Sequence, residues 1–245
     1  MNTSVKLFDF RNISLIATLI LCFLSVHYVN GQSHRGNYNY KEFQAKPYYF
    51  GITLGYNSSA FDITPSDHFI DNEYIAEVQS VSGPGFNLGI VSNLKIGKYF
   101  DFRFLPTLSF AEKNITYTSV NNERPNYSRK VESVFVELPF QARYKSAPFN
   151  DIRLFMIAGL KYSYDVNGSR NFRQADEFVK ISPTNFAVEY GAGVQFFFPY
   201  FIFSPEIKVS HGLGNTLIYN GNLEESNVIE KVLSRALTIS LHFEG

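Results

Sequence analysis

One stretch of the sequence combines histidine with acidic residues and could carry out chemistry. His68 lies among Asp67, Asp71 and Glu73, a set of nitrogen and oxygen donors that could hold a metal ion or form part of a lipid-modifying active site. The same residues are also typical of a hydrated acidic loop. We favour the loop, because the sequence offers no identifiable partner residues, and we expect no catalytic residue, no metal site and no cofactor.

Composition narrows the remaining chemistry. The chain has 1 Cys among its 245 residues, so neither an intrachain disulfide nor a cysteine-based zinc cluster can form. Lys+Arg 22 balances Asp+Glu 22, which gives no electrostatic reason to expect a nucleic-acid partner. Aromatic residues make up 17% of the chain and charged residues 18%, a composition that argues against disorder and against a coiled coil.

The other candidate site residues are charged residues inside otherwise apolar, alternating segments. They are Arg103, Glu137, Arg143, Arg153, Lys161, Glu189, Glu206 and Lys208. If these segments are the strands of one barrel, the charged side chains share its interior. There the carboxylates must pair with the cations, because an unpaired buried charge is strongly destabilising. We expect a structural cluster that fills the lumen rather than a path for protons or solutes.

Apolar and polar residues alternate with a period of two in eight segments, and this pattern predicts β-strands. The predicted strands span 48–56, 85–93, 99–111, 133–145, 152–164, 185–198, 201–210 and 235–244. Pro106, Pro139 and Pro205 fall inside these segments, where proline removes a ladder donor, so we expect local bends or bulges there.

The links between the predicted strands alternate in length. Short links fall at 94–98, 146–151 and 199–200, and long links at 57–84, 112–132, 165–184 and 211–234. This alternation is typical of outer-membrane barrels, which have short periplasmic turns and longer extracellular loops. We therefore predict an all-β fold over 47–245, an eight-stranded antiparallel up-and-down transmembrane β-barrel of outer-membrane type.

A soluble lipocalin-like barrel would also have alternating strands, with its apolar rows turned inward. Those rows are rich in Phe here and would overfill the interior of eight strands, which just accommodates side chains. The polar rows contain glycines and the charged residues, so we place the polar rows in the lumen and the apolar rows against lipid. An aromatic girdle is expected beside the short links, formed by Tyr48, Phe100, Tyr144, Phe196, Phe198, Tyr200 and Phe201.

The beginning of the chain has the pattern of an export signal. Lys6 and Arg11 flank the start of an apolar run at 13–26, which is shorter than the ~20 residues of a spanning helix and fits a signal-peptide core. Lipidation of Cys22 is the alternative, which we do not favour because Leu21 precedes it and a later cleavage point is available. We expect a cleaved signal peptide at 1–31, a flexible segment at 32–46 and a barrel in the cell outer membrane.

Long stretches of the chain resemble the PorT family (SprT in gliding bacteria), outer-membrane components of the type IX secretion system of Bacteroidota. They are PYYFGITLGYN at 47–57, PGFNLGIVSNLKIGKYFDFRFLPTLSF at 84–110, KVESVFVELPF at 130–140, GLKYSYD at 159–165 and EYGAGVQFFFPYFIFSPEIKVSHGLGN at 189–215. The resemblance implies a non-enzymatic protein that is needed for export of cargo with a C-terminal sorting domain, and for gliding where the organism glides. It also implies other envelope proteins of the secretion system as partners.

Two further functions are compatible with the residues. A stand-alone structural or adhesive barrel would bind an external ligand through its loops. A lipid-modifying enzyme would depend on His68.

Overall fold

The structure is a computed structural model that describes residues 38–66, 75–119, 127–167, 180–218 and 229–245. The predicted signal peptide and the His68 segment lie outside these residues. Within the described part of the chain, no helix is long and apolar enough to cross a membrane.

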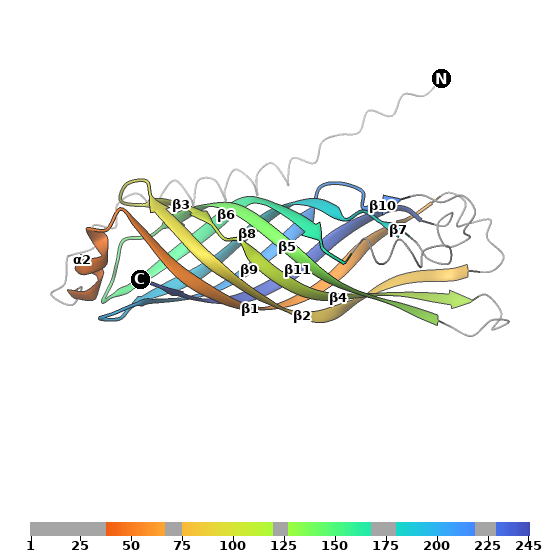
Figure 1. Cartoon of the computed structure of the whole chain (residues 1–245), viewed down its shortest axis with the longest axis horizontal. Helices are drawn as coiled ribbons and strands as arrows, with labels where there is room; N and C mark the ends of the chain where they lie inside the picture. Colours follow the sequence, from red (N-terminus) through yellow and green to blue (C-terminus); the bar gives the residue numbers. More distant parts are fainter. Residues whose placement is uncertain (1–37, 67–74, 120–126, 168–179, 219–228) are drawn as a thin grey trace, which may run out of the picture. The chain divides into compact units, whose positions relative to one another are not determined.

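Antiparallel strands form a closed ring (Figure 1). The strands are β1 (Tyr48–Pro65), β2 (Ile75–Lys95), β3 (Phe100–Phe104), β4 (Thr107–Ser119), β5 (Tyr127–Lys145), β6 (Ile152–Asp165), β8 (Thr184–Phe197), β9 (Ile202–Gly212) and β11 (Ile229–Glu244). Apart from β3 and β4, each strand of the ring pairs with its neighbours along the chain, and β1 also pairs with β11, which closes the ring. Because β1 pairs with β11, neither the first nor the last strand of the ring is left as a sheet edge.

Strands β3 and β4 occupy one position in this ring. Both pair with β2 on one side and with β5 on the other, so the ring has eight positions as predicted. Leu105 and Pro106 separate the two strands, but the register with β2 and with β5 is the same on both sides of Pro106, so the strand is interrupted without a bulge. Pro139 and Pro205, in contrast, lie within the continuous strands β5 and β9. Each removes a single ladder donor, and the pairs on either side keep the register.

The apolar rows face outward and the polar rows face the lumen, which confirms the predicted orientation. In β1 the outward residues Tyr48, Phe50, Ile52, Leu54 and Tyr56 are each between 45% and 59% exposed. The alternate residues Tyr49, Thr53 and Asn57 are buried. Successive side chains of a strand point to opposite faces, so this alternation holds all the way round the ring.

Several strands continue beyond their predicted bounds on the side of the long links. β1 ends at Pro65 rather than at 56, and β2 begins at Ile75 rather than at 85. β4, β5 and β11 are extended in the same direction. The extensions lack the regular apolar row of the spanning segments. Backbone pairing, such as that of Ser59 with Ala236, forms these parts of the strands without a lipid-facing surface. The predicted long links are correspondingly shorter in the structure.

The described part of the segment 32–46, for which we expected flexibility, contains the helix α2 (Tyr38–Gln44). Tyr40 and Phe43, three residues apart, lie on one face of α2 and pack against Phe197 and Ile202. The rings of Tyr40 and Phe197 meet edge to face with centroids 5.1 Å apart. A helix of 7 residues is marginal by itself, so this packing at the short-turn end of the ring stabilises it.

A two-residue ladder joins β7 (Lys180–Ile181) to β10 (Leu217–Ile218). Figure 1 shows this small sheet at the end of the ring opposite α2. Phe61, Ile229 and Val232 are buried near the loop ends of β1 and β11. Apolar side chains therefore occupy the interior near the loop ends of these two strands.

Candidate functional site

The eight charged residues singled out from the sequence all lie on the lumen side, and none has more than 8% of its surface exposed. They come from β3, β5, β6, β8 and β9, and each stands on the inward row of its strand. Seven of them fall into two groups of ion pairs, whereas Arg153 lies apart at the short-turn end.

The first group, here called the central cluster, consists of Arg103, Arg143, Glu206, Glu244 and His242. Arg103 donates through Nη1 to Glu206 Oε2 and through Nη2 to Glu244 Oε1, both at 2.9 Å. Arg143 Nη2 donates to the same Glu244 oxygen at 2.9 Å, and His242 Nε2 lies 3.4 Å from Glu206 Oε2. Two guanidinium groups thus face two carboxylates, and the cluster is balanced when His242 is neutral.

The second group, the loop-side cluster, consists of Lys161, Lys208, Glu137 and Glu189. Lys161 Nζ lies 3.0 Å from Glu137 Oε1 and 3.4 Å from Glu189 Oε1. Lys208 Nζ lies 3.4 Å from Glu189 Oε2, which also accepts a hydrogen bond of 2.9 Å from Gln141. This cluster again has two cations and two carboxylates. Balance of this kind is required where charge is withdrawn from water.

Glycine on the inward rows makes room for these large side chains. A Cβ at Gly193 would lie 2.4 Å from Cζ of Phe155, whose ring is buried. The guanidinium carbon of Arg143 lies 4.7 Å from the centroid of that same ring. Gly193 therefore permits Phe155 to enter the lumen and to support Arg143 from the side by a cation–π contact.

Several lumen residues were not among the predicted site residues. Glu244, His242, Asp101, Lys145 and Tyr49 are buried beside the predicted ones, and Glu244 joins both arginines of the central cluster. Each stands on a predicted polar row, and that is the signal that could have identified it. All five lie within three residues of a strand end, where a sequence pattern cannot separate the lumen from the solvent.

Arg153 has hydrogen-bond partners but no carboxylate partner among the described residues. Its Nε and Nη2 donate to the backbone carbonyls of Ser146 and Lys98, both at 2.6 Å, and its Nη1 donates to the Tyr40 hydroxyl at 3.3 Å. These contacts join two short turns to α2. Close by, Lys145 pairs with Asp101, and the Lys95 ammonium donates to the backbone carbonyl of Phe43.

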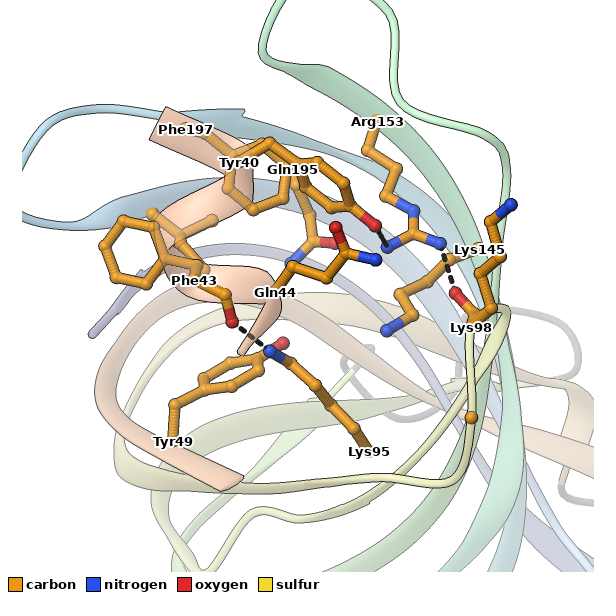
Figure 2. Close-up of a pocket in the computed structure, with 12 residues that line it drawn as sticks. Tyr40, Phe43, Gln44, Tyr49, Lys95, Lys98, Lys145, Arg153, Gln195 and Phe197 are labelled. Carbon is orange, nitrogen blue, oxygen red and sulfur yellow. Dashed lines mark hydrogen bonds between the residues drawn. The ribbon is translucent and has the colours of Figure 1, made fainter. Parts of the chain in front are cut away.

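A cavity of about 310 Å³ lies between α2 and the ends of the strands (Figure 2). It is lined by Tyr40, Phe43, Gln44, Tyr49, Lys95, Gly97, Lys98, Lys145, Arg153, Gln195, Phe197 and Ile202. Cationic, aromatic and amide side chains thus surround one space at the short-turn end. We call this space the mouth cavity.

The described residues contain no group of three His, Cys, Asp or Glu side chains that could hold a metal ion. The His68 set that the sequence singled out lies in a part of the chain that the structure does not describe.

Aromatic side chains ring the outside of the short-turn end. The predicted girdle residues Tyr48, Phe100, Tyr144, Phe198, Tyr200 and Phe201 are exposed there, and Phe196 is half-buried. Phe198 stacks on Phe201 with centroids 4.9 Å apart, and Phe100 lies 5.1 Å from Tyr144. Aromatic side chains at this position are typical of the boundary between the hydrocarbon region of the bilayer and water.

A closed ring with outward apolar rows, an aromatic girdle and a buried ionic lumen defines a transmembrane β-barrel of the outer-membrane type. The chain belongs to the family described as "Outer membrane protein beta-barrel domain", whose model matches residues 30–217. It is an outer-membrane protein, and the bilayer surrounds its outward rows.

Solved outer-membrane proteins are similar to this chain. OprG of Pseudomonas aeruginosa has a TM-score of 0.48 and 9% identity, over 80% of this chain and 93% of its own. Neisserial surface protein A has a TM-score of 0.39 and 12% identity, over 79% and 95%. Ail, the attachment invasion locus protein of Yersinia pestis, has a TM-score of 0.34 and 13% identity, over 82% and 100%. No curated protein matches the chain in sequence.

Proposed function

We propose that this protein is a non-enzymatic component of the type IX secretion system, needed for protein export and for gliding where the organism glides. It acts through contacts of its outer wall and its ends with other envelope proteins. The observation that carries this proposal is the filled lumen, because a barrel whose interior is occupied by paired charges must act through its surfaces.

The central cluster accounts for this mode of action. Arg103, Arg143, Glu206 and Glu244 are fully buried side chains that meet across the bore from four different strands. Opening a path would separate ion pairs in a region of low dielectric constant, which is strongly unfavourable. An eight-stranded barrel has little interior space beyond that of its side chains. Transport of a folded cargo through this lumen is therefore not part of the proposal.

The link to type IX secretion rests on the resemblance to the PorT family. The segment 84–110 forms the end of β2, the turn that follows, β3 and the start of β4. The segment 189–215 forms most of β8 and the whole of β9. Both segments cross the bilayer and include a short turn. The resemblance thus lies in the wall and the short-turn end, which faces the periplasm in barrels of this type.

The proposal includes export of the chain. A cleaved signal peptide at 1–31 would deliver residues 32–245 to the outer membrane. N-terminal sequencing of the protein isolated from outer membranes tests this part, and a first residue other than Gln32 would move the proposed cleavage point.

A deletion strain tests the function. We expect it to lose export of cargo with a C-terminal sorting domain while the outer membrane stays intact, and expression of the wild-type chain should restore export. Purification of the tagged protein from native membranes should recover other subunits of the secretion system. Normal export in the deletion strain would refute the proposal.

Normal export together with isolated monomers would instead favour a stand-alone structural or adhesive barrel. Loss of a lipid modification on substitution of His68 would support an enzymatic role.

A further inference from the structure

Charge is unevenly distributed along the lumen. The central and loop-side clusters each combine two cations with two carboxylates. At the mouth cavity, Lys95, Lys145 and Arg153 stand against Asp101, which pairs with Lys145. Among the described residues no carboxylate lines this cavity. Asp151, at the same end, accepts the backbone N–H of Tyr40 at 3.0 Å and is not part of the lining.

Two cations of the mouth cavity, Lys95 and Arg153, are held in place by neutral groups. Arg153 is 4% exposed, and its hydrogen bonds go to two carbonyls and one hydroxyl. The Lys95 ammonium donates to the Phe43 carbonyl and lies 5.4 Å from the centroid of the Tyr49 ring. Ammonium and guanidinium groups have three and five N–H donors, so both side chains keep donors beyond these contacts. Figure 2 shows Lys95 and Arg153 on opposite sides of the space beneath α2.

The rest of the lining suits an organic anion. Phe43, Phe197 and Ile202 supply apolar surface, and Gln44 and Gln195 supply amides that can both donate and accept. Polar and apolar residues thus share the walls of this small cavity, and polar groups from several elements converge on one space, as they do in ligand sites.

We infer that the mouth cavity binds an anionic oxygen group, a carboxylate or a phosphate, presented at the short-turn end. Lys95 and Arg153 provide the charge and the hydrogen bonds, and the aromatic side chains of α2 cover the bound group. Cations outnumber carboxylates in this part of the lumen. Binding of an anion there is favourable, because a buried cation without a counter-charge is stabilised by an anion. The inference does not depend on the role in secretion.

Titration calorimetry on the full barrel in detergent tests the site. Sodium pyrophosphate is the first probe. A short N-acetylated peptide ending in phenylalanine is the second, used both with a free C-terminal carboxylate and with an amide. We expect pyrophosphate or the free-acid peptide to bind. Binding should weaken as salt is added, because the attraction is between charges at a partly open site.

Three variants make the result specific to the cavity. Binding should be at least tenfold weaker in Lys95→Met and in Arg153→Gln. It should be unchanged in Lys41→Gln, which removes an exposed charge of α2 outside the lining. Lys95→Met keeps the site testable if Arg153→Gln fails to fold, since Arg153 also holds two turns.

The outcomes separate the sources of the anion. Binding of pyrophosphate alone assigns the site to a free or lipid-borne phosphate. Binding of the free-acid peptide but not of the amide assigns it to the carboxyl end of a polypeptide. No binding of any probe, equal binding of acid and amide, or undiminished binding in both cavity variants would overturn the inference.

Discussion

Glu244 and Arg103 are 141 residues apart in the sequence, yet Glu244 Oε1 accepts a hydrogen bond of 2.9 Å from Arg103 Nη2 inside the lumen. The same oxygen accepts a second hydrogen bond from Arg143. One carboxylate on β11 therefore reaches across the lumen to the neighbouring strands β3 and β5. Together with Glu206 it balances the charge of the two guanidinium groups.

Glu244→Gln should lower the free energy of unfolding by about 3–5 kcal/mol, because it leaves two buried arginines with one carboxylate between them. The chain contains 0 Trp, so unfolding by urea in lipid vesicles is best followed by circular dichroism. The control is Glu230→Gln, which changes an exposed carboxylate of the same strand and should shift stability by no more than about 0.5 kcal/mol. Equal effects of the two variants would contradict the role of Glu244.

Lys161→Met should destabilise the barrel by about 3 kcal/mol, because it removes the cation that pairs with Glu137 at 3.0 Å. The double variant Lys161→Met/Glu137→Leu should regain most of this loss, since replacing both partners of a buried pair by apolar side chains is often neutral. Glu189 keeps Lys208 as its partner in both variants. The same urea unfolding measures this cycle, and strict additivity of the two substitutions would refute the pairing.

Gly193→Ala should destabilise the barrel by about 1–3 kcal/mol through overpacking, because the new Cβ would lie 2.4 Å from the Phe155 ring and 2.5 Å from the backbone oxygen of Pro205. Phe155→Leu shortens that ring side chain, so the two substitutions together should cost less than the sum of their separate effects. Gly214→Ala is the control, since a Cβ there meets nothing within 4 Å. The prediction fails if the effects of Gly193→Ala and Phe155→Leu simply add.

Leu160→Arg places a charge on the outward row and should cost about 2–4 kcal/mol in lipid vesicles, because Leu160 lies on the lipid face away from the strand ends. Tyr200→Arg, in the turn between β8 and β9, should cost about 0–1 kcal/mol since water is close. Urea unfolding in the same vesicles gives both values. A similar cost for the two variants would mean that Leu160 does not face hydrocarbon.

Tyr40→Ala/Phe43→Ala should release α2 from Phe197 and Ile202 without making the barrel conduct ions. The reason is that the central cluster, not the helix, fills the bore at the level of Arg103 and Glu206. The measurement is the conductance of a planar lipid bilayer that contains the double variant, and the control is the same measurement on the wild-type barrel. A steady conductance in the double variant alone would show that α2 is the seal.

Much of the fold follows from the sequence because a strand in a barrel wall meets two very different environments. The Phe-rich row of 99–111 can face lipid and its partner row with Arg103 cannot, so the period of two reveals both the strands and their orientation. Beyond the bilayer, both faces of a strand meet water or polar groups, so the apolar and polar rows no longer differ. For this reason the sequence predicted that the first strand ends at 56, whereas β1 ends at Pro65.

The sequence by itself determined the strand pattern, the outward face and the inward direction of the eight charged side chains. The tertiary structure decided which charges meet, because partners such as Glu244 and Arg103 come together through the closure and stagger of the ring. It also decided that residues 38–44 form a helix, since the burial of Tyr40 and Phe43 against Phe197 exists once the strands have placed that surface beneath them. A local sequence pattern shows whether a residue favours an apolar or a polar environment. Which residues form that environment depends on distant segments that folding brings together.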